Sequence, residues 1–211
     1  MEQYNTCLQS SHDAMNTAQR AVKRFFDIAG AAMALILLWP LMLVFAVLLW
    51  MQHNGPAIFC QERIGKGGEP FTIYKFRTMS KDSEKDGPQL VPHAEGVAST
   101  DLERFLRSHH LDELPQLWNV LRGDMSIVGP RPERKFFIDK IMEYDKRYPI
   151  IYEMRPGLTS EATLYNGYTD TIEKMIKRLD MDIHYLETRS LTGDCKIIAK
   201  TVKSIVSGKK F

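Results

Sequence analysis

Cysteine and one-sided charge are both scarce in this 211-residue chain. Cys7, Cys60 and Cys195 lie far apart, so the sequence indicates neither a zinc knuckle nor a disulfide framework and is typical of a reducing compartment. The formal net charge is only +2 at pH 7. Such a balance gives no general positive field, and nucleic acid is not expected as a partner.

Charge is missing altogether from one stretch of the chain, from Ile28 to Met51. A run of this length is enough to cross a hydrocarbon core of about 30 Å. Pro40 lies near its middle and removes a helical hydrogen bond. Each half then has about 11 or 12 residues and a length of roughly 17 Å, too short to span alone.

Two membrane shapes are compatible with this run: a kinked spanning helix, or a re-entrant helix that returns to the face it entered. The residues alone favour the spanning helix, because kinked membrane helices are common. The flanks mildly favour the re-entrant shape, because basic residues precede the run (Lys23, Arg24) and follow it (Arg63, Lys66), so that both ends could stay on the cytosolic side.

The rest of the chain indicates a mixed fold. Residues 57–64 and 71–79 read as two strands joined at Gly65-Lys66-Gly67-Gly68, which predicts a β-hairpin. The glycines also weakly suggest a phosphate loop, but a turn is favoured because no helical pattern follows at once. Residues 80–100 are polar and predict a surface loop. Helical patterns cover 101–107, 113–122, 133–147, 170–188 and 196–207.

The final predicted helix is amphipathic and basic. Ile198, Val202 and Ile205 share one face, while lysines occupy another. Such a helix is typical of an anionic membrane surface, and a helix packed on the core is an equally good interpretation.

Adjacent carboxylates, Asp112 and Glu113, begin the predicted helix 113–122. Taken alone, they are best explained as helix capping. Nearby cations shift the balance, because Arg107 precedes the pair and Lys75 and Arg77 end the predicted hairpin. Cations around two carboxylates could hold a diphosphate and a divalent metal, and a carboxylate can attack phosphorus.

Pro130-Arg131-Pro132 is too stiff for a helix or a central strand. It either fixes Arg131 for phosphate binding or is a simple loop, and the residues do not decide between these. His109 and His110 have no third histidine at a metal-ligand spacing, so surface or packing roles are favoured.

Several longer motifs carry a family resemblance over about Lys23 to Thr159. They read Lys23-Arg24-Phe25-Phe26-Asp27, Phe59-Cys60-Gln61-Glu62-Arg63-Ile64-Gly65, Tyr74-Lys75-Phe76-Arg77-Thr78-Met79, Leu111-Asp112-Glu113-Leu114-Pro115-Gln116-Leu117-Trp118-Asn119-Val120, Gly123-Asp124-Met125-Ser126-Ile127-Val128-Gly129-Pro130-Arg131-Pro132 and Arg155-Pro156-Gly157-Leu158-Thr159. In this order they closely resemble the bacterial sugar transferase family, the monotopic polyprenol-phosphate phosphoglycosyl transferases.

The resemblance implies a transferase that moves a sugar 1-phosphate from a UDP-sugar to polyprenol (undecaprenyl) phosphate and releases UMP. It implies that Asp112 forms a covalent phosphosugar intermediate and that Glu113 binds Mg²⁺. Arg107 and Arg131 are implied to line the phosphate and nucleotide site. With them, Lys75, Arg77 and Arg155 are predicted to bind substrate.

The resemblance also implies a re-entrant helix, which replaces the spanning one. The expected fold is α+β and mostly helical, with a small hairpin and amphipathic interfacial helices. We expect a polar leader (1–22), the re-entrant helix (23–52) and a catalytic domain (53–211) with a basic C-terminal helix, at the cytoplasmic face of a bacterial inner membrane. The chain resembles the small form of the family, and a homodimer is also considered.

Three departures from the family pattern affect specific expectations. The helix break reads Trp39-Pro40, without the usual serine. His109-His110 replaces smaller residues, and Ser160 to Tyr165 differs from the usual sequence, which leaves the sugar and the glycoconjugate pathway open. Rival functions are a carboxylate and metal phosphohydrolase, and a non-catalytic membrane scaffold.

Overall fold

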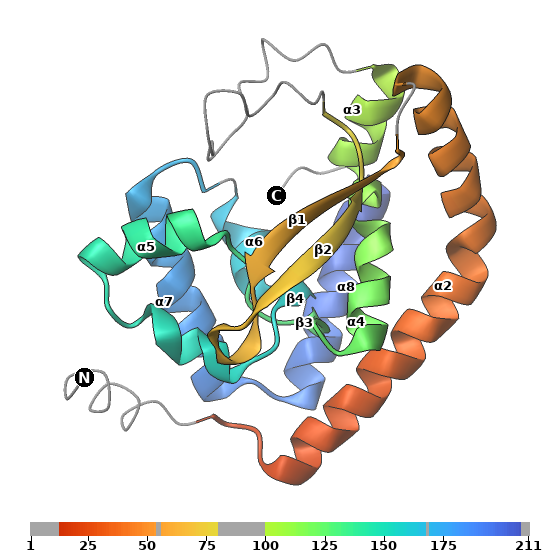
Figure 1. Ribbon diagram of the computed structural model, residues 1–211. Coiled ribbons are helices and arrows are strands. Elements are labelled where there is room, and N and C mark those ends of the chain that lie inside the picture. The colour runs from red at the N-terminus through yellow and green to blue at the C-terminus, as the bar shows by residue number, and fades with distance from the viewer. Residues whose placement is uncertain (1–12, 54–55, 80–99, 168, 208–211) are drawn as a thin grey trace.

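One long helix, α2 (Thr17–His53), runs along a whole side of the molecule (Figure 1). This computed structural model describes residues 13–53, 56–79, 100–167 and 169–207. The helix is long and apolar enough to cross a membrane. It continues through Pro40, and its re-entrant course stays a prediction.

The two faces of α2 differ sharply. The buried side chains recur at four-residue spacing, at Lys23, Asp27 and Ala31 and again at Phe45 and Leu49. This stripe packs on the rest of the chain along both halves of the helix. The opposite face exposes large apolar side chains, among them Phe25, Phe26, Met33, Ile36, Leu37, Trp39, Leu43, Val44, Trp50 and Met51.

Polar contacts attach the first turns of α2 to distant segments. The ammonium of Lys23 donates to Asp194 Oδ2 at 2.7 Å. The carboxylate of Asp27 accepts from Ser126 Oγ at 2.6 Å and from the Ile127 backbone N–H at 3.1 Å. These groups are buried, so they fix where α2 lies against the fold.

The predicted hairpin is confirmed. Strand β1 (Ile58–Ile64) pairs antiparallel with β2 (Pro70–Phe76), and Phe59 faces Lys75 in the register. The connecting turn contains a short 3-10 segment, η1 (Lys66–Gly68). Gly67 and Gly68 have φ angles of +73° and +79°, a conformation that favours glycine.

The remaining elements are mostly helical, as predicted. They are α3 (Asp101–Ser108), η3 (Leu111–Gln116), α4 (Leu117–Arg122), α5 (Lys135–Tyr144), η4 (Tyr148–Glu153), α6 (Glu161–Asn166), α7 (Ile172–Thr188) and α8 (Leu191–Ser207). The predicted helix 113–122 is divided into η3 and α4. The predicted loop at 80–100 lies, apart from its last residue, outside the described residues.

A second small sheet was not predicted. Strands β3 (Ser126–Val128) and β4 (Gly157–Thr159) pair in parallel. Each has only three residues, too few for a periodic pattern. The pairing joins two family motifs that lie about 30 residues apart.

Candidate functional site

The two carboxylates lie in the first turn of η3, not of an α-helix. His110 precedes this segment with φ +54° and ψ +22°, a left-handed conformation that is uncommon outside glycine. The Glu113 N–H donates to the His110 carbonyl at 3.3 Å. His110 therefore turns the chain sharply before Asp112 and Glu113. The neighbouring His109 packs its ring on Phe105, at 4.4 Å between ring centroids.

The carboxylate of Glu113 contacts cations. Lys75 Nζ on β2 donates to Glu113 Oε1 at 2.6 Å, and Arg131 Nη2 donates to the same oxygen at 3.1 Å. The side chains of Glu113 and Lys75 are only 13% and 16% exposed. Two charges of one sign thus converge on one buried oxygen, an arrangement that goes beyond helix capping.

The two acids titrate differently. Burial raises the pKa of Asp112, and the negative charge of Glu113 raises it further, to about 6. Burial also acts on Glu113, but Lys75 and Arg131 oppose it and hold the pKa of Glu113 well below its usual value. Glu113 therefore favours its charged form more strongly than Asp112 does, because the cations contact Glu113 directly.

A close crossing of two backbones fixes the position of Arg131. The Gly129 N–H donates to Thr159 O at 3.0 Å, and the Gly157 N–H donates to Pro130 O at 2.8 Å. A Cβ at Gly157 would lie 2.1 Å from Gly129 N. Only glycine fits there, and the crossing determines where the Pro130-Arg131-Pro132 turn begins.

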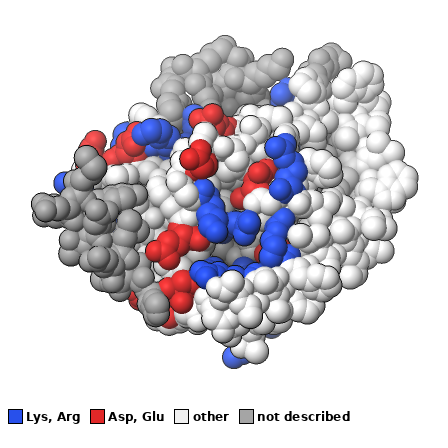
Figure 2. All heavy atoms as spheres, turned by 60° about the horizontal axis from the view of Figure 1, so that its bottom comes forward, with Lys and Arg blue, Asp and Glu red and all other residues white. Residues whose placement is uncertain are grey.

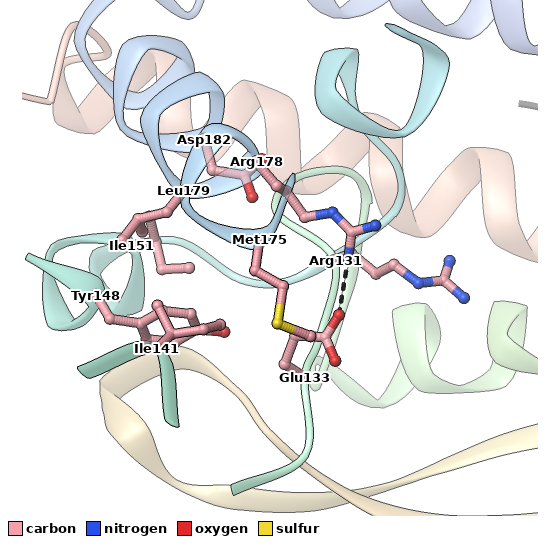
Figure 3. Close-up of a pocket in the computed structure, with 9 residues that line it drawn as sticks. All are labelled: Arg131, Glu133, Ile141, Tyr148, Ile151, Met175, Arg178, Leu179 and Asp182. Carbon is pink, nitrogen blue, oxygen red and sulfur yellow. Dashed lines mark hydrogen bonds and ion pairs between the residues drawn. The ribbon is translucent and has the colours of Figure 1, made fainter. Parts of the chain in front are cut away.

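A buried charged group holds the far side of the same turn. Glu133 accepts from Arg178 Nη1 on α7 at 2.8 Å (Figure 3) and from Arg63 Nη1 on β1 at 3.4 Å. Arg63 also donates to Pro132 O at 3.4 Å. The turn that carries Arg131 is thereby braced from β1 and from α7.

These mostly buried residues surround a small pocket. Figure 3 draws its lining, which consists of Arg131, Glu133, Ile141, Tyr148, Ile151, Met175, Arg178, Leu179 and Asp182. Among the described residues, the buried side-chain atoms without a hydrogen-bond partner are Arg63 Nε, Arg178 Nε and Asp182 Oδ1. In the sequence, Arg63 was named as a cation that follows the apolar run and as part of a family motif, and Glu133, Arg178 and Asp182 were not predicted as site residues. The charges of Arg178 and Asp182 on the otherwise apolar face of helix 170–188 were the sequence feature that could have indicated this pocket.

The other predicted substrate-binding cations do not pair with the carboxylates. The charge of Arg107 lowers the pKa of Asp112 without a direct ion pair. Arg77 follows β2, and its backbone N–H donates to Ala57 O at 2.7 Å. Arg155 Nε donates to Gly123 O at 2.9 Å, at the end of α4. The structure thus brings Asp112, Glu113, Lys75 and Arg131 together, with Arg107 near, and places Arg155 elsewhere.

The donor set is compatible with the predicted Mg²⁺. Within the described ranges, no group of three or more His, Cys, Asp or Glu side chains could form a complete protein cage. Magnesium is commonly held by one or two carboxylates together with substrate phosphates and water. The adjacent carboxylates of Asp112 and Glu113 supply that minimal set.

Comparison with known proteins defines the class. The model of the bacterial sugar transferase family matches residues 18–208. The chain belongs to this family, which confirms the resemblance seen in the motifs.

The relatives are named as sugar-phosphate transferases. The chain is 43% identical over 188 residues to the UDP-glucose:undecaprenyl-phosphate glucose-1-phosphate transferase of Caulobacter vibrioides, covering 88% of this chain and 70% of the relative. It is 38% identical over 190 residues to the UDP-N-acetylgalactosamine-undecaprenyl-phosphate N-acetylgalactosaminephosphotransferase of Aeromonas hydrophila, covering 89% and 44%. An Escherichia coli (strain K12) relative with the same name as the Caulobacter one is 37% identical over 190 residues, covering 89% and 41%. The chain therefore spans less than half the length of two of these three.

Proposed function

We propose that this chain is a phosphoglycosyl transferase that moves a sugar 1-phosphate from a UDP-sugar to undecaprenyl phosphate. The observation that carries the proposal is the difference in partners between two adjacent acids. Glu113 is bound by Lys75 and Arg131, whereas the Asp112 carboxylate makes no ion pair or side-chain hydrogen bond with another described residue. Asp112 is thus available as a nucleophile, and the names of the relatives supply the substrate classes.

The proposed reaction has two displacements at one phosphorus atom. A carboxylate oxygen of Asp112 attacks the β-phosphorus of the UDP-sugar, and the bond to the bridging oxygen breaks, so that UMP leaves with the electron pair. A phosphate oxygen of undecaprenyl phosphate then attacks the same phosphorus. The bond to Asp112 breaks, and the free carboxylate is restored.

The cations reduce the electrostatic repulsion between the Asp112 carboxylate and the negatively charged phosphoryl group. Arg131 has a planar fork of donors that suits two phosphoryl oxygens, and its turn is fixed on both sides. Lys75 adds a second charge beside Glu113. Glu113, with Asp112 adjacent, would hold Mg²⁺, which supplies further neutralisation of phosphoryl oxygens when bound.

Helix α2 supports a location at the membrane. Its exposed face is apolar, while the polar domain packs along both of its halves. A helix that crossed to the far side would separate one half from that domain, so we favour the monotopic, re-entrant course at the cytoplasmic face of the inner membrane. Phe105 on α3 and Trp118 on α4 are also exposed and would lie at the interface. The homodimer stays a prediction.

The experiment is the intact mass of the full chain after mixing with a UDP-sugar and Mg²⁺ but no polyprenol phosphate. We expect a gain of one sugar phosphate that maps to Asp112, with one equivalent of UMP released. Asp112→Asn should form no adduct, and Glu113→Gln should form it slowly and with a weaker magnesium dependence.

The rival functions give different results in the same assay. A phosphohydrolase would release the sugar phosphate into water in a continuing reaction. A scaffold would release no UMP. An adduct on another residue would overturn the role of Asp112, and a requirement for both substrates together would favour direct attack by the lipid phosphate.

A further inference from the structure

A group of cations gathers at the base of α2, away from the two carboxylates. Figure 2 shows Lys and Arg side chains around a hollow on this face. Arg20 and Arg24 lie one turn apart on α2, and Arg24 and Arg155 both donate to backbone carbonyls at the end of α4. The charges of Arg155 and Arg20 also act on Lys66 of the hairpin turn. We call Arg20, Arg24, Lys66 and Arg155 the basal cluster.

The basal cluster is distinct from the candidate active site. Arg24 Nη2 donates to Val120 O at 2.7 Å, and Arg155 Nε donates to Gly123 O at 2.9 Å. Both carbonyls lie at the C-terminal end of α4, whereas η3 with the two acids precedes its N-terminal end. A six-residue helix separates the two places by roughly 9 Å. The hydrogen bond to Gly123 O therefore explains the position of Arg155 without the predicted role in binding the catalytic phosphates.

Carboxylates do not fully balance the cluster. Asp13 is shared between Arg20, at 3.1 Å, and Arg189, which donates to it from Nε at 2.8 Å. Asp27 and Asp124 both act on Arg24, but Asp27 also accepts from Ser126 and from the Ile127 N–H, and Asp124 also pairs with Arg122 at 3.6 Å. Burial and then the neighbouring arginines lower the pKa of Lys66. Like charges held this close favour an anion between them.

The basal cluster lies where the charged first turns of α2 are followed by its uncharged segment. Val22, Phe25 and Phe26 are exposed, and from Ile28 onward the helix carries no charge through Met51. Cations one turn before such an apolar face lie at the depth of lipid headgroups. The occupant that fits both observations is a phosphate that carries acyl chains.

We propose that the basal cluster binds the headgroup of an anionic phospholipid and so sets the depth of α2 at the membrane surface. Lys66, which the Gly67 and Gly68 turn presents, and Arg20 would contact the phosphate. Arg24 and Arg155 would contribute charge while they hold the end of α4. This inference rests on the membrane placement in the proposed function, but it needs no transfer activity.

The test uses the full chain purified in detergent and measures its thermal unfolding with two short-chain lipids, dihexanoyl phosphatidylglycerol and dihexanoyl phosphatidylcholine. A ligand that binds only the folded state raises Tm with its concentration. We expect the anionic lipid to raise the wild-type Tm more than the zwitterionic lipid, and salt to reduce the difference. Lys66→Gln combined with Arg20→Gln should lose at least half of that difference, measured from its own lipid-free Tm. Lys177→Gln, which removes an exposed charge on α7, should keep it.

Four results would overturn the proposal. One is an equal shift from the two lipids, and another is a full shift in the double variant. An equal shift from inorganic phosphate would show a general anion site. A much larger shift from a short-chain polyprenyl phosphate would assign the cluster to the acceptor substrate. A wild type that transfers sugar phosphate normally but fails this test would separate the inference from the proposed function.

Discussion

Lys75 Nζ lies 2.6 Å from Glu113 Oε1, and this contact ties strand β2 to the segment that carries both acids. Because the partners are mostly buried, the ion pair organises the site before any substrate arrives. Among the described residues, the neighbouring Asp112 carboxylate has no ion-pair partner.

Lys75→Met should lower the free energy of unfolding by about 3 kcal/mol, because among the described residues it leaves the mostly buried carboxylate of Glu113 paired with Arg131 alone. The double variant Lys75→Met, Glu113→Gln should recover part of this loss. Chemical denaturation of Lys75→Met, of Glu113→Gln and of the double variant, each against the wild type, measures the coupling. Additive losses would show that the pair makes no special contribution to stability.

Arg131→Lys should lower transfer by about 100-fold or more while the protein stays folded, because lysine keeps the charge but loses the fork that orients phosphoryl oxygens. Initial rates of UMP release at saturating UDP-sugar measure the effect. Arg147→Lys, at an ion pair with Asp145 and Asp180, is the matched control and should be close to wild type. Equal rates in both variants would make the turn purely structural.

Gly157→Ala should cost more than about 3 kcal/mol or prevent folding, because the new Cβ would meet the Gly129 backbone. Gly30→Ala is the control, since its Cβ would meet only the end of the Ile127 side chain at 3.1 Å. Soluble yield in detergent and Tm are the readouts. A stable Gly157→Ala variant with wild-type activity would contradict the role given to the backbone crossing.

Asp182→Asn should stabilise the protein increasingly as pH rises. Burial raises the pKa of Asp182 to about 7, so between about pH 4 and pH 7 the folded state retains a proton that the unfolded state has lost. Wild-type stability attributable to this group therefore falls with rising pH over that window and stays low above it. Asparagine cannot ionise, so the Tm difference should be small near pH 4 and several degrees near pH 8.

Asp180→Asn is the control for that series, because Asp180 is exposed on the same helix and pairs with Arg147. Its Tm difference from the wild type should change little over the same range. A flat difference for Asp182→Asn would mean that Asp182 is not protonated in the folded state at neutral pH.

The local sequence pattern was enough to predict those elements whose residues show a clear periodicity or turn signal. The uncharged run predicted the long helix, and alternating residues around a glycine turn predicted the hairpin, because periodicity and turn chemistry are properties of neighbouring residues. The motifs identified the family. The division after Gln116 between η3 and α4 was missed, because helical spacing continues through both segments.

The sequence by itself determined the apolar helix, the hairpin, the family and the acid pair Asp112-Glu113. Only the tertiary structure decided which cations reach that pair. Arg155 and Arg131 were both predicted to bind substrate, yet Arg155 donates to Gly123 O at the end of α4, while Arg131 reaches Glu113. The reason is that the position of Arg131 depends on long-range contacts. They are the crossing of Gly129 with Gly157 and the ion pairs of Glu133 with Arg63 and Arg178. Short segments carry no signal of contacts with residues so far along the chain.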